Sequence, residues 1–391
     1  MHSAYTNDPV RHRVDVHDCA SRGRLSWPDP AEWSLLNRPF MIGPDSNTNH
    51  YLWLLSTVFC SADSNSVVLW NGSSTLRFES DLDLVSRAIS RLDGTERQDA
   101  LLEDEILGQL IPLLDEEGWL VRMSRPLRDV VGETSALSRQ LAYYAQLQRV
   151  APESALDILA KTTVAIVGVG GVGGIAAQTL AGSGVGNLIL MDPDVVDASN
   201  MNRQLLYQRN DVGRLKVEIA SEFLRARHQG LTVETHAANP FLDRTSNAAL
   251  ARANFILFAG DSDTTLGDGA LPMPRVPIMN CGYVGALGII GPVHVPGVSC
   301  WRCGGLEEFD SLSRTQQPRS VAWNCSGAGI NGIIGSFVAE RITRFIVPSL
   351  GEPLDYDQTV LIHMESMSLS FEKNAALPLC SHFTESAPGA P

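Results

Sequence analysis

Four glycines that follow a short apolar run have the spacing of a phosphate-binding turn. The run Val164–Val167 is typical of a buried strand, and Ile175–Leu180, beyond the glycines, predicts a helix. Glycines at such a turn let phosphate oxygens approach backbone N–H groups at the helix N-terminus. A second strand, Asn187–Met191, leads to Asp192, where a carboxylate would bind ribose hydroxyls. We therefore predict a nucleotide site built on Gly168, Gly170, Gly171 and Gly173.

Charged and polar residues beyond Asp192 narrow the choice of nucleotide. The glycine turn alone fits NAD, FAD or ATP. An enzyme that transfers a hydride does not need an arginine and a lysine here. An enzyme that acts on a triphosphate does, because a guanidinium can donate two hydrogen bonds to phosphate oxygens and a lysine adds a positive charge. The apolar run Phe255–Ala259 is followed closely by Asp261, a carboxylate suited to Mg²⁺ on the phosphates. The segment beyond Asp192 supplies Asp194, Asn202, Arg203 and Lys216, and Arg203 and Lys216 are the residues suited to phosphate.

Composition excludes several other classes of protein. The 391 residues are 44% hydrophobic and 19% charged, which is typical of a globular chain. The net charge of −14 argues against a nucleic-acid surface, which needs clustered lysine and arginine. The sequence contains neither an apolar run of about 20 residues nor an apolar stretch near its start. We therefore expect a cytoplasmic protein with no nucleic-acid or membrane partner.

The elements that must position these residues fall into three predicted parts. Residues 1–125 contain a hairpin, two helical stretches and a returning strand, Trp119–Val121, which is the order of a small α+β winged-helix-like domain. Residues 126–152 form a linker and a helix. Residues 153–391 alternate strands and helices, which predicts an α/β, Rossmann-like, doubly wound and mostly parallel sheet.

Several spaced motifs give these residues a specific resemblance. The pattern GxGGVG…LxxxDPDxVxxSNxNRQxLY…DVGRxKV…GDSD resembles the adenylating domain of the ThiF, MoeB and ubiquitin-activating enzymes, over about Arg139 to Arg344. In that family a carboxylate attacks the α-phosphate of ATP, pyrophosphate leaves and an acyl-adenylate remains. The resemblance implies ATP and Mg²⁺ as ligands and a homodimer as the assembly.

The family's residue roles carry over by position. Asp192 corresponds to the ribose ligand and Asp261 to the magnesium carboxylate. Asn202, Arg203, Gln204 and Lys216 correspond to the phosphate-binding group. Arg139 corresponds to an arginine that reaches across the dimer to the γ-phosphate. The apolar stretch Ile330–Val347 is a candidate for part of the dimer interface, or alternatively ordinary core.

The cysteines suggest a structural zinc site. Cys300 and Cys303 have the spacing of a metal knuckle, and structural zinc takes four ligands. Family members supply a second CxxC near the C-terminus, whereas this chain has Cys380 and His382 there. Zn²⁺ is therefore expected on these four residues, with packed cysteines as the alternative. Cys325 resembles a cysteine that some family members place over the active site, and is either a thiol nucleophile or a small residue near a helix start.

The long N-terminal part suggests the substrate. It resembles the layout of adenylating enzymes of ribosomally made peptide natural products, such as MccB and PaaA, whose N-terminal peptide clamp holds a precursor peptide. A peptide strand added at Ser66–Phe78 would explain such binding. The expected function is adenylation of a carboxylate on that peptide. Activation of a ubiquitin-like sulfur carrier and non-catalytic peptide delivery remain as alternatives.

Overall fold

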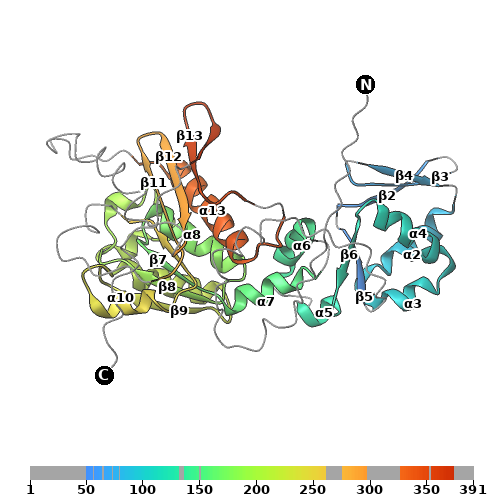
Figure 1. Ribbon diagram of the computed structural model, residues 1–391, viewed down its shortest axis with the longest axis horizontal. Helices are drawn as coiled ribbons and strands as arrows, with labels where there is room; N and C mark the ends of the chain where they lie inside the picture. Colours follow the sequence, from blue (N-terminus) through green and yellow to red (C-terminus); the bar gives the residue numbers. More distant parts are fainter. Residues whose placement is uncertain are drawn as a thin grey trace.

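The computed structural model describes residues 50–373, apart from 56, 64–65, 73, 79, 132–135, 149–150, 261–274, 297–325 and 352–353 (Figure 1). Within this part an eight-stranded sheet is built in the order β14-β13-β12-β11-β10-β7-β8-β9. The parallel strands are β7 (Thr163–Val167), β8 (Asn187–Met191), β9 (Thr232–His236), β10 (Phe255–Phe258) and β11 (Ile278–Val284). The antiparallel strands are β12 (Leu287–His294), β13 (Gln358–His363) and β14 (Ser368–Lys373). The predicted doubly wound, mostly parallel sheet is confirmed.

Strand order places a ligand site at one edge of this sheet. Chain order runs outward from β7 in both directions, to β8 and β9 on one side and to β10 and β11 on the other. The order therefore reverses between β7 and β10. Ligands of such sheets bind outside the carboxyl ends of the strands at this reversal.

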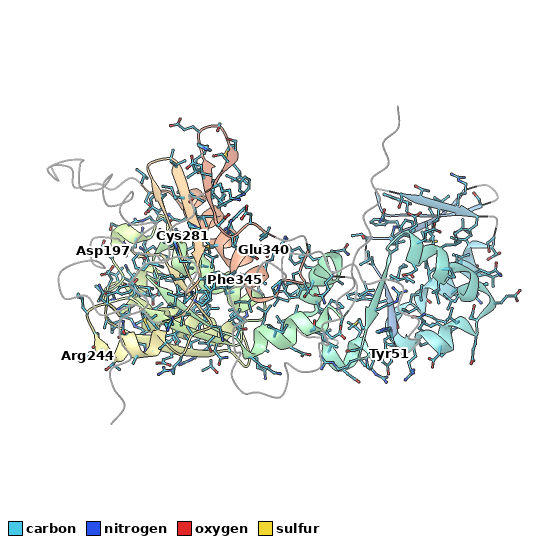
Figure 2. The ribbon with its side chains drawn as sticks, in the orientation of Figure 1. Tyr51, Asp197, Arg244, Cys281, Glu340 and Phe345 are labelled. Carbon is cyan, nitrogen blue, oxygen red and sulfur yellow. The ribbon has the colours of Figure 1, made fainter. Side chains whose placement is uncertain are left out.

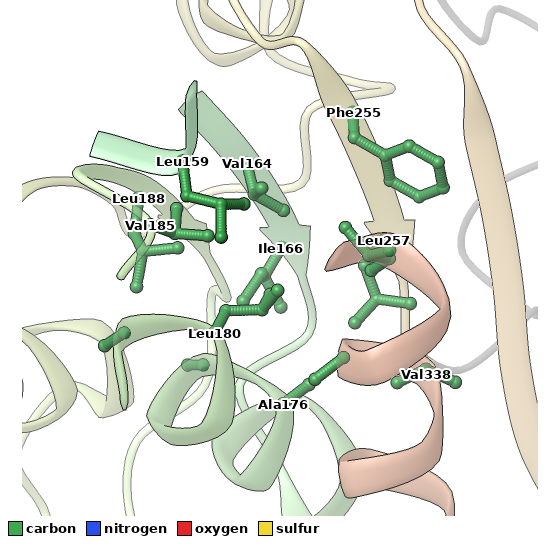
Figure 3. Packing of buried hydrophobic residues seen from close by; sticks show 14 of the residues in the cluster. Leu159, Val164, Ile166, Ala176, Leu180, Val185, Leu188, Phe255, Leu257 and Val338 are labelled. Carbon is green, nitrogen blue, oxygen red and sulfur yellow. The ribbon is translucent and has the colours of Figure 1, made fainter. Parts of the chain in front are cut away.

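Helices cover both faces of the sheet. On one face lie α6 (Ser138–Leu147), α7 (Glu153–Lys161), α8 (Gly171–Gly182), α9 (Lys216–Arg227) and α13 (Ala328–Ile346), and on the other lies α10 (Arg244–Leu250). Side chains of β7 alternate between the faces. Val164 and Ile166 pack in one cluster with Leu180 of α8 (Figure 3), while Ala165 belongs to the cluster that contains Leu250 of α10. Burial on both faces explains why β7 is apolar throughout.

The N-terminal module, the described residues 50–125, contains two small sheets. One has the order β5-β1-β6, with β1 (Tyr51–Leu54), β5 (Asp93–Arg97) and β6 (Leu120–Met123). The other has the order β2-β3-β4, with β2 (Phe59–Asp63), β3 (Ser66–Trp70) and β4 (Thr75–Phe78). The helices are α2 (Leu82–Ser90), α3 (Gln98–Leu102) and α4 (Glu105–Glu116), followed by α5 (Leu127–Val130). This is the small α+β fold predicted, including the β3–β4 hairpin.

Two details of the module differ from the sequence-based expectation. Between the two predicted helical stretches the structure has a strand that the sequence pattern does not predict: Thr95 and Glu96 lie in β5, which pairs with β1 through Tyr51 and Arg97. The expected peptide-receiving region, Ser66–Phe78, includes β3, which is paired on both edges. Of the two strands in this region, β4 has one edge that is not paired with another described strand.

The module and the large sheet meet through α6 and α7, which lie between them (Figure 1). Glu153, at the first turn of α7, is 1% exposed. Its Oε1 accepts hydrogen bonds from the backbone N–H and the hydroxyl of Ser124, both at 2.7 Å. Strand β6 also places Val121 and Met123 in the core beneath α6 and Leu120 in the core of the module. The junction is therefore packed rather than loosely tethered.

We expect Glu153→Ala to destabilise the protein by about 1–3 kcal/mol, because it removes both hydrogen bonds that join Ser124 to the buried carboxylate, and hydrogen bonds to a charged group are the stronger kind. Urea unfolding measures the change. The matched control is Asp157→Ala on the same helix, whose ion pair with Arg125 joins side chains that are 55% and 44% exposed. An exposed pair contributes about 0–1 kcal/mol. Equal losses in the two variants would contradict a buried junction.

Across the described residues, none of the helices has the length and apolar character needed to cross a bilayer.

Candidate nucleotide site

The glycine turn lies at the reversal point of the sheet. Gly168 follows β7 with φ of +90°, a conformation that favours glycine. A β-carbon there would lie 2.7 Å from Cα of Gly260, which follows β10. The turn therefore brings the backbones that follow β7 and β10 into direct contact. Helix α8 begins at Gly171, so its N-terminal N–H groups face this edge of the sheet.

Asp192 holds the turn in place from the end of β8. Its carboxylate is buried and accepts hydrogen bonds from the N–H of Val169 at 2.7 Å and of Asp194 at 2.9 Å. Burial raises the pKa of Asp192, against the opposing charge of Lys216 and these two hydrogen bonds. The Tyr207 hydroxyl donates to the carbonyl of Val169. Both backbone groups of Val169 are therefore fixed, which orients the turn.

Replacing Asp192 by asparagine should weaken ATP binding by about one to two orders of magnitude. An amide has one accepting oxygen, so its NH₂ would face a backbone N–H, and an unsatisfied buried donor costs about 1–3 kcal/mol. Calorimetric titration with ATP measures the loss. Asp197→Asn is the matched control, since Asp197 caps an exposed turn of the same loop (Figure 2) and asparagine caps equally well. Equal weakening by both variants would contradict a specific role for Asp192.

Lys216 brings a buried positive charge to the site. It is the first residue of α9 and is 6% exposed. Its Nζ lies 2.7 Å from Oδ2 of Asp194, whose side chain is 64% exposed. The ammonium group of Lys216 thus lies near the Asp192 carboxylate. Because its partner Asp194 is exposed, a phosphate oxygen can take the place of Asp194 in the ion pair.

Asn202, Arg203 and Gln204 lie in the loop after Asp197. Nη1 of Arg203 donates to the carbonyl of Ser199 at 2.8 Å and to Oδ1 of Asn202 at 3.0 Å. Gln204 is 6% exposed, and its Nε2 would lie 3.5 Å from a β-carbon at Gly170. Its buried Oε1 has no hydrogen-bond partner among the described residues. The carboxamide of Gln204 thus lies beside the glycine turn.

The structure brings most of the predicted nucleotide-site residues together, but not all of them. The four glycines, Asp192, Asp194, Lys216 and the loop 202–204 share one edge of the sheet. Arg139 does not join them within its own chain. It is exposed on α6, whose Tyr144 hydroxyl donates to the carbonyl of Ser183 at the C-terminal end of α8. The 12 residues of α8, about 18 Å, separate that end from the glycine turn.

Other predicted residues lie outside the described part of the chain: Asp261, Cys300, Cys303, Cys325, Cys380 and His382. No group of three or more metal-ligating side chains occurs within the described ranges.

Three contacting residues were not found by sequence reasoning. Asn331 of α13 lies against Gly171 and is hydrogen-bonded to Ser326, which in turn is hydrogen-bonded to Tyr283. A signal for one of them exists, because Asn331 is a polar residue within the apolar run of α13. The expected interface on Ile330–Val347 is mostly core, since Ile334, Val338 and Ile342 are buried.

Comparison with known proteins supports this interpretation. The MOCS3 adenylyltransferase and sulfurtransferase of Anopheles gambiae is 30% identical over 199 residues, 49% of this chain. The match spans 43% of that protein, so this chain spans less than half the length of that relative. MccB of E. coli, crystallised with ATP, shares the fold with a TM-score of 0.62 and 22% identity, over 85% of this chain and 99% of MccB. PaaA does so with a TM-score of 0.57 and 22% identity, over 71% and 94%.

The family profile decides membership. The ThiF family matches residues 142–381, more than half of the chain, and includes the glycine turn, Asp192, Arg203 and Lys216. The chain belongs to the ThiF family.

Proposed function

We propose that this chain is an ATP-dependent adenylating enzyme that acts on a carboxylate of a ribosomally made precursor peptide. The reaction would take place in the cytoplasm, as a step in the biosynthesis of a peptide natural product. Dehydration, cyclisation or nucleotidyl modification of the peptide would follow. The observation that carries the proposal is the N-terminal module, because the likeness to the MccB fold extends over both it and the ThiF region. MccB has been crystallised with MccA, which supports a peptide substrate. We assign peptide binding to residues 1–125, the linker to 126–152 and adenylation to 153–391.

In this proposal the chain's own residues align ATP with the carboxylate. Asp192 accepts hydrogen bonds from the ribose hydroxyls, and the N–H groups at the start of α8 face the phosphates. Arg203 and Lys216 bind phosphate oxygens, for which Lys216 leaves Asp194. A carboxylate oxygen forms a bond to the α-phosphorus as the bond to the bridging oxygen breaks and pyrophosphate departs. The carboxylate is already charged, so no general base is needed, and catalysis is electrostatic.

Metals complete the proposed site. Asp261 would hold Mg²⁺, which neutralises charge on the departing pyrophosphate. Cys300, Cys303, Cys380 and His382 would hold a structural zinc ion. These ligand types suit the respective metals.

The peptide would bind as a strand on the outer edge of β4, Thr75–Phe78. Main-chain hydrogen bonds along this edge would hold a leader segment of varied sequence. Because the junction at Glu153 is packed, the bound peptide would carry its carboxylate at a high local concentration near the ATP site.

A homodimer would supply Arg139 from the partner. Within one chain, α6, the helix that carries this arginine, contacts the end of α8 that is far from the glycine turn. We therefore propose that a second copy of the chain presents Arg139 to the γ-phosphate.

ATP–pyrophosphate exchange with and without candidate precursor peptides tests the proposal. We expect exchange that requires the peptide, and mass spectrometry would then identify the product. A second candidate function is activation of a ubiquitin-like sulfur carrier, which the name of the MOCS3 relative favours. Exchange with a sulfur-carrier protein but not with peptides would replace the peptide proposal by this one.

A further inference from the structure

Side chains from three elements converge on Ser326, two residues before α13. The Ser326 hydroxyl is hydrogen-bonded to the Tyr283 hydroxyl, from β11, and accepts from Nδ2 of Asn331 at 3.1 Å. Its backbone carbonyl accepts from Nδ2 of Asn202 at 3.1 Å. Ser326 therefore joins α13 and β11 to the loop that carries Arg203.

Asn331 connects this point to the glycine turn. It is 1% exposed, and its Nδ2 donates to the carbonyl of Gly327 at 2.7 Å as well as to Ser326. Both amide hydrogens are thus used. The carboxamide lies so close to Gly171 that a β-carbon there would meet it at 2.7 Å. A buried polar group with all its donors satisfied fixes a single geometry. The start of α13 is therefore held in register with the start of α8.

Asn202 connects Ser326 to Arg203. Its Nδ2 donates a hydrogen bond to the backbone carbonyl of Ser326, and its Oδ1 accepts one from Nη1 of Arg203 at 3.0 Å. Asn202 is exposed, and Arg203 is half-buried. A long arginine side chain loses much conformational freedom when it binds phosphate, so an arginine already held in place binds more tightly.

We propose that Asn331, Ser326 and Asn202 are positioning residues that orient the guanidinium of Arg203 toward the nucleotide phosphates. In this arrangement Asn202 acts through Arg203 and is not itself a phosphate ligand. The inference rests on the proposed role of Arg203. It also explains why a buried asparagine occurs in the apolar helix α13.

A double-mutant cycle on ATP binding tests, in the full-length protein, whether Asn331 and Asn202 act through Arg203. Asn202→Ala and Asn331→Ala should each weaken ATP binding about tenfold, the size of a coupling between contacting residues. In an Arg203→Ala background the same substitutions should change the dissociation constant less than about twofold, since their target is gone. Effects of the same size in both backgrounds would overturn the inference, because Asn202 would then act independently of Arg203.

Thr343→Val separates positioning from stability. Thr343 lies near the other end of α13, where its hydroxyl donates to the carbonyl of Ala339 at 2.9 Å. This variant should lower the melting temperature without changing ATP affinity. If Asn331→Ala behaves as Thr343→Val does, its role is structural and the inference fails. If Arg203→Ala alone leaves ATP binding and exchange unchanged, the proposed role of Arg203 fails instead.

Discussion

Replacing Arg203 by alanine is expected to lower peptide-dependent ATP–pyrophosphate exchange by about two to three orders of magnitude, the typical cost of removing a preorganised group that stabilises transition-state charge. The attacking carboxylate and the phosphates are all anionic, so the chain must supply positive charge where they meet. Arg203 lies at the reversal point of the sheet with its Nη1 held by Ser199 and Asn202. The measurement is the rate of ATP–pyrophosphate exchange at saturating ATP and peptide.

Two further variants separate geometry from charge. Arg203→Lys keeps the charge but not the planar fork, so its exchange rate should fall between those of wild type and Arg203→Ala. Arg209→Ala removes an equal charge from an exposed position in the same loop and should leave exchange close to wild type. If Arg209→Ala is as slow as Arg203→Ala, the effect comes from net charge. Urea unfolding should show similar stability for the three variants.

The sequence was sufficient to predict the large sheet where apolar runs are bounded by turn residues. The predicted strand Asn187–Met191 coincides with β8, because the four consecutive apolar residues after Asn187 fit a strand that is buried on both faces. The N-terminal module was harder. Asp93–Arg97 has no apolar alternation, and its pairing with β1, more than 30 residues away along the chain, makes it a strand. Such long-range pairing is absent from any local pattern.

The site was predictable to the extent that it follows one stretch of chain. The glycine turn, Asp192, Arg203 and Lys216 lie within about 50 residues, and the parallel sheet brings them together as expected. Asn331 and Tyr283 come from elements far along the chain, so only the folded structure places them beside Gly171 and Ser326. The packing of α6, the helix that carries Arg139, against the far end of α8 is likewise seen only in the folded structure.

Gly173→Ala should have the largest effect on the fold of any single methyl addition to the glycine turn. A β-carbon at Gly173 would lie 1.9 Å from the carbonyl oxygen of Gly168. The obstacle is backbone, which cannot rotate away, so α8 would have to move from β7 or the turn would have to open. We expect a destabilisation of about 3 kcal/mol or more, in the range of severe core changes, together with loss of measurable ATP binding.

The neighbouring residue supplies the control for this prediction. A β-carbon at Gly174 would meet Leu206 no closer than 3.8 Å, an ordinary contact. Alanine is also favoured over glycine within a helix by about 0.5–1 kcal/mol, so Gly174→Ala should leave ATP binding intact and raise stability slightly. Both variants add one methyl group to the same turn of α8, so opposite signs can come only from the contact with Gly168. If both variants gain stability, α8 does not pack against the turn as closely as described. If both lose stability and ATP binding equally, the glycines matter for backbone freedom along the whole helix start and not for one close approach.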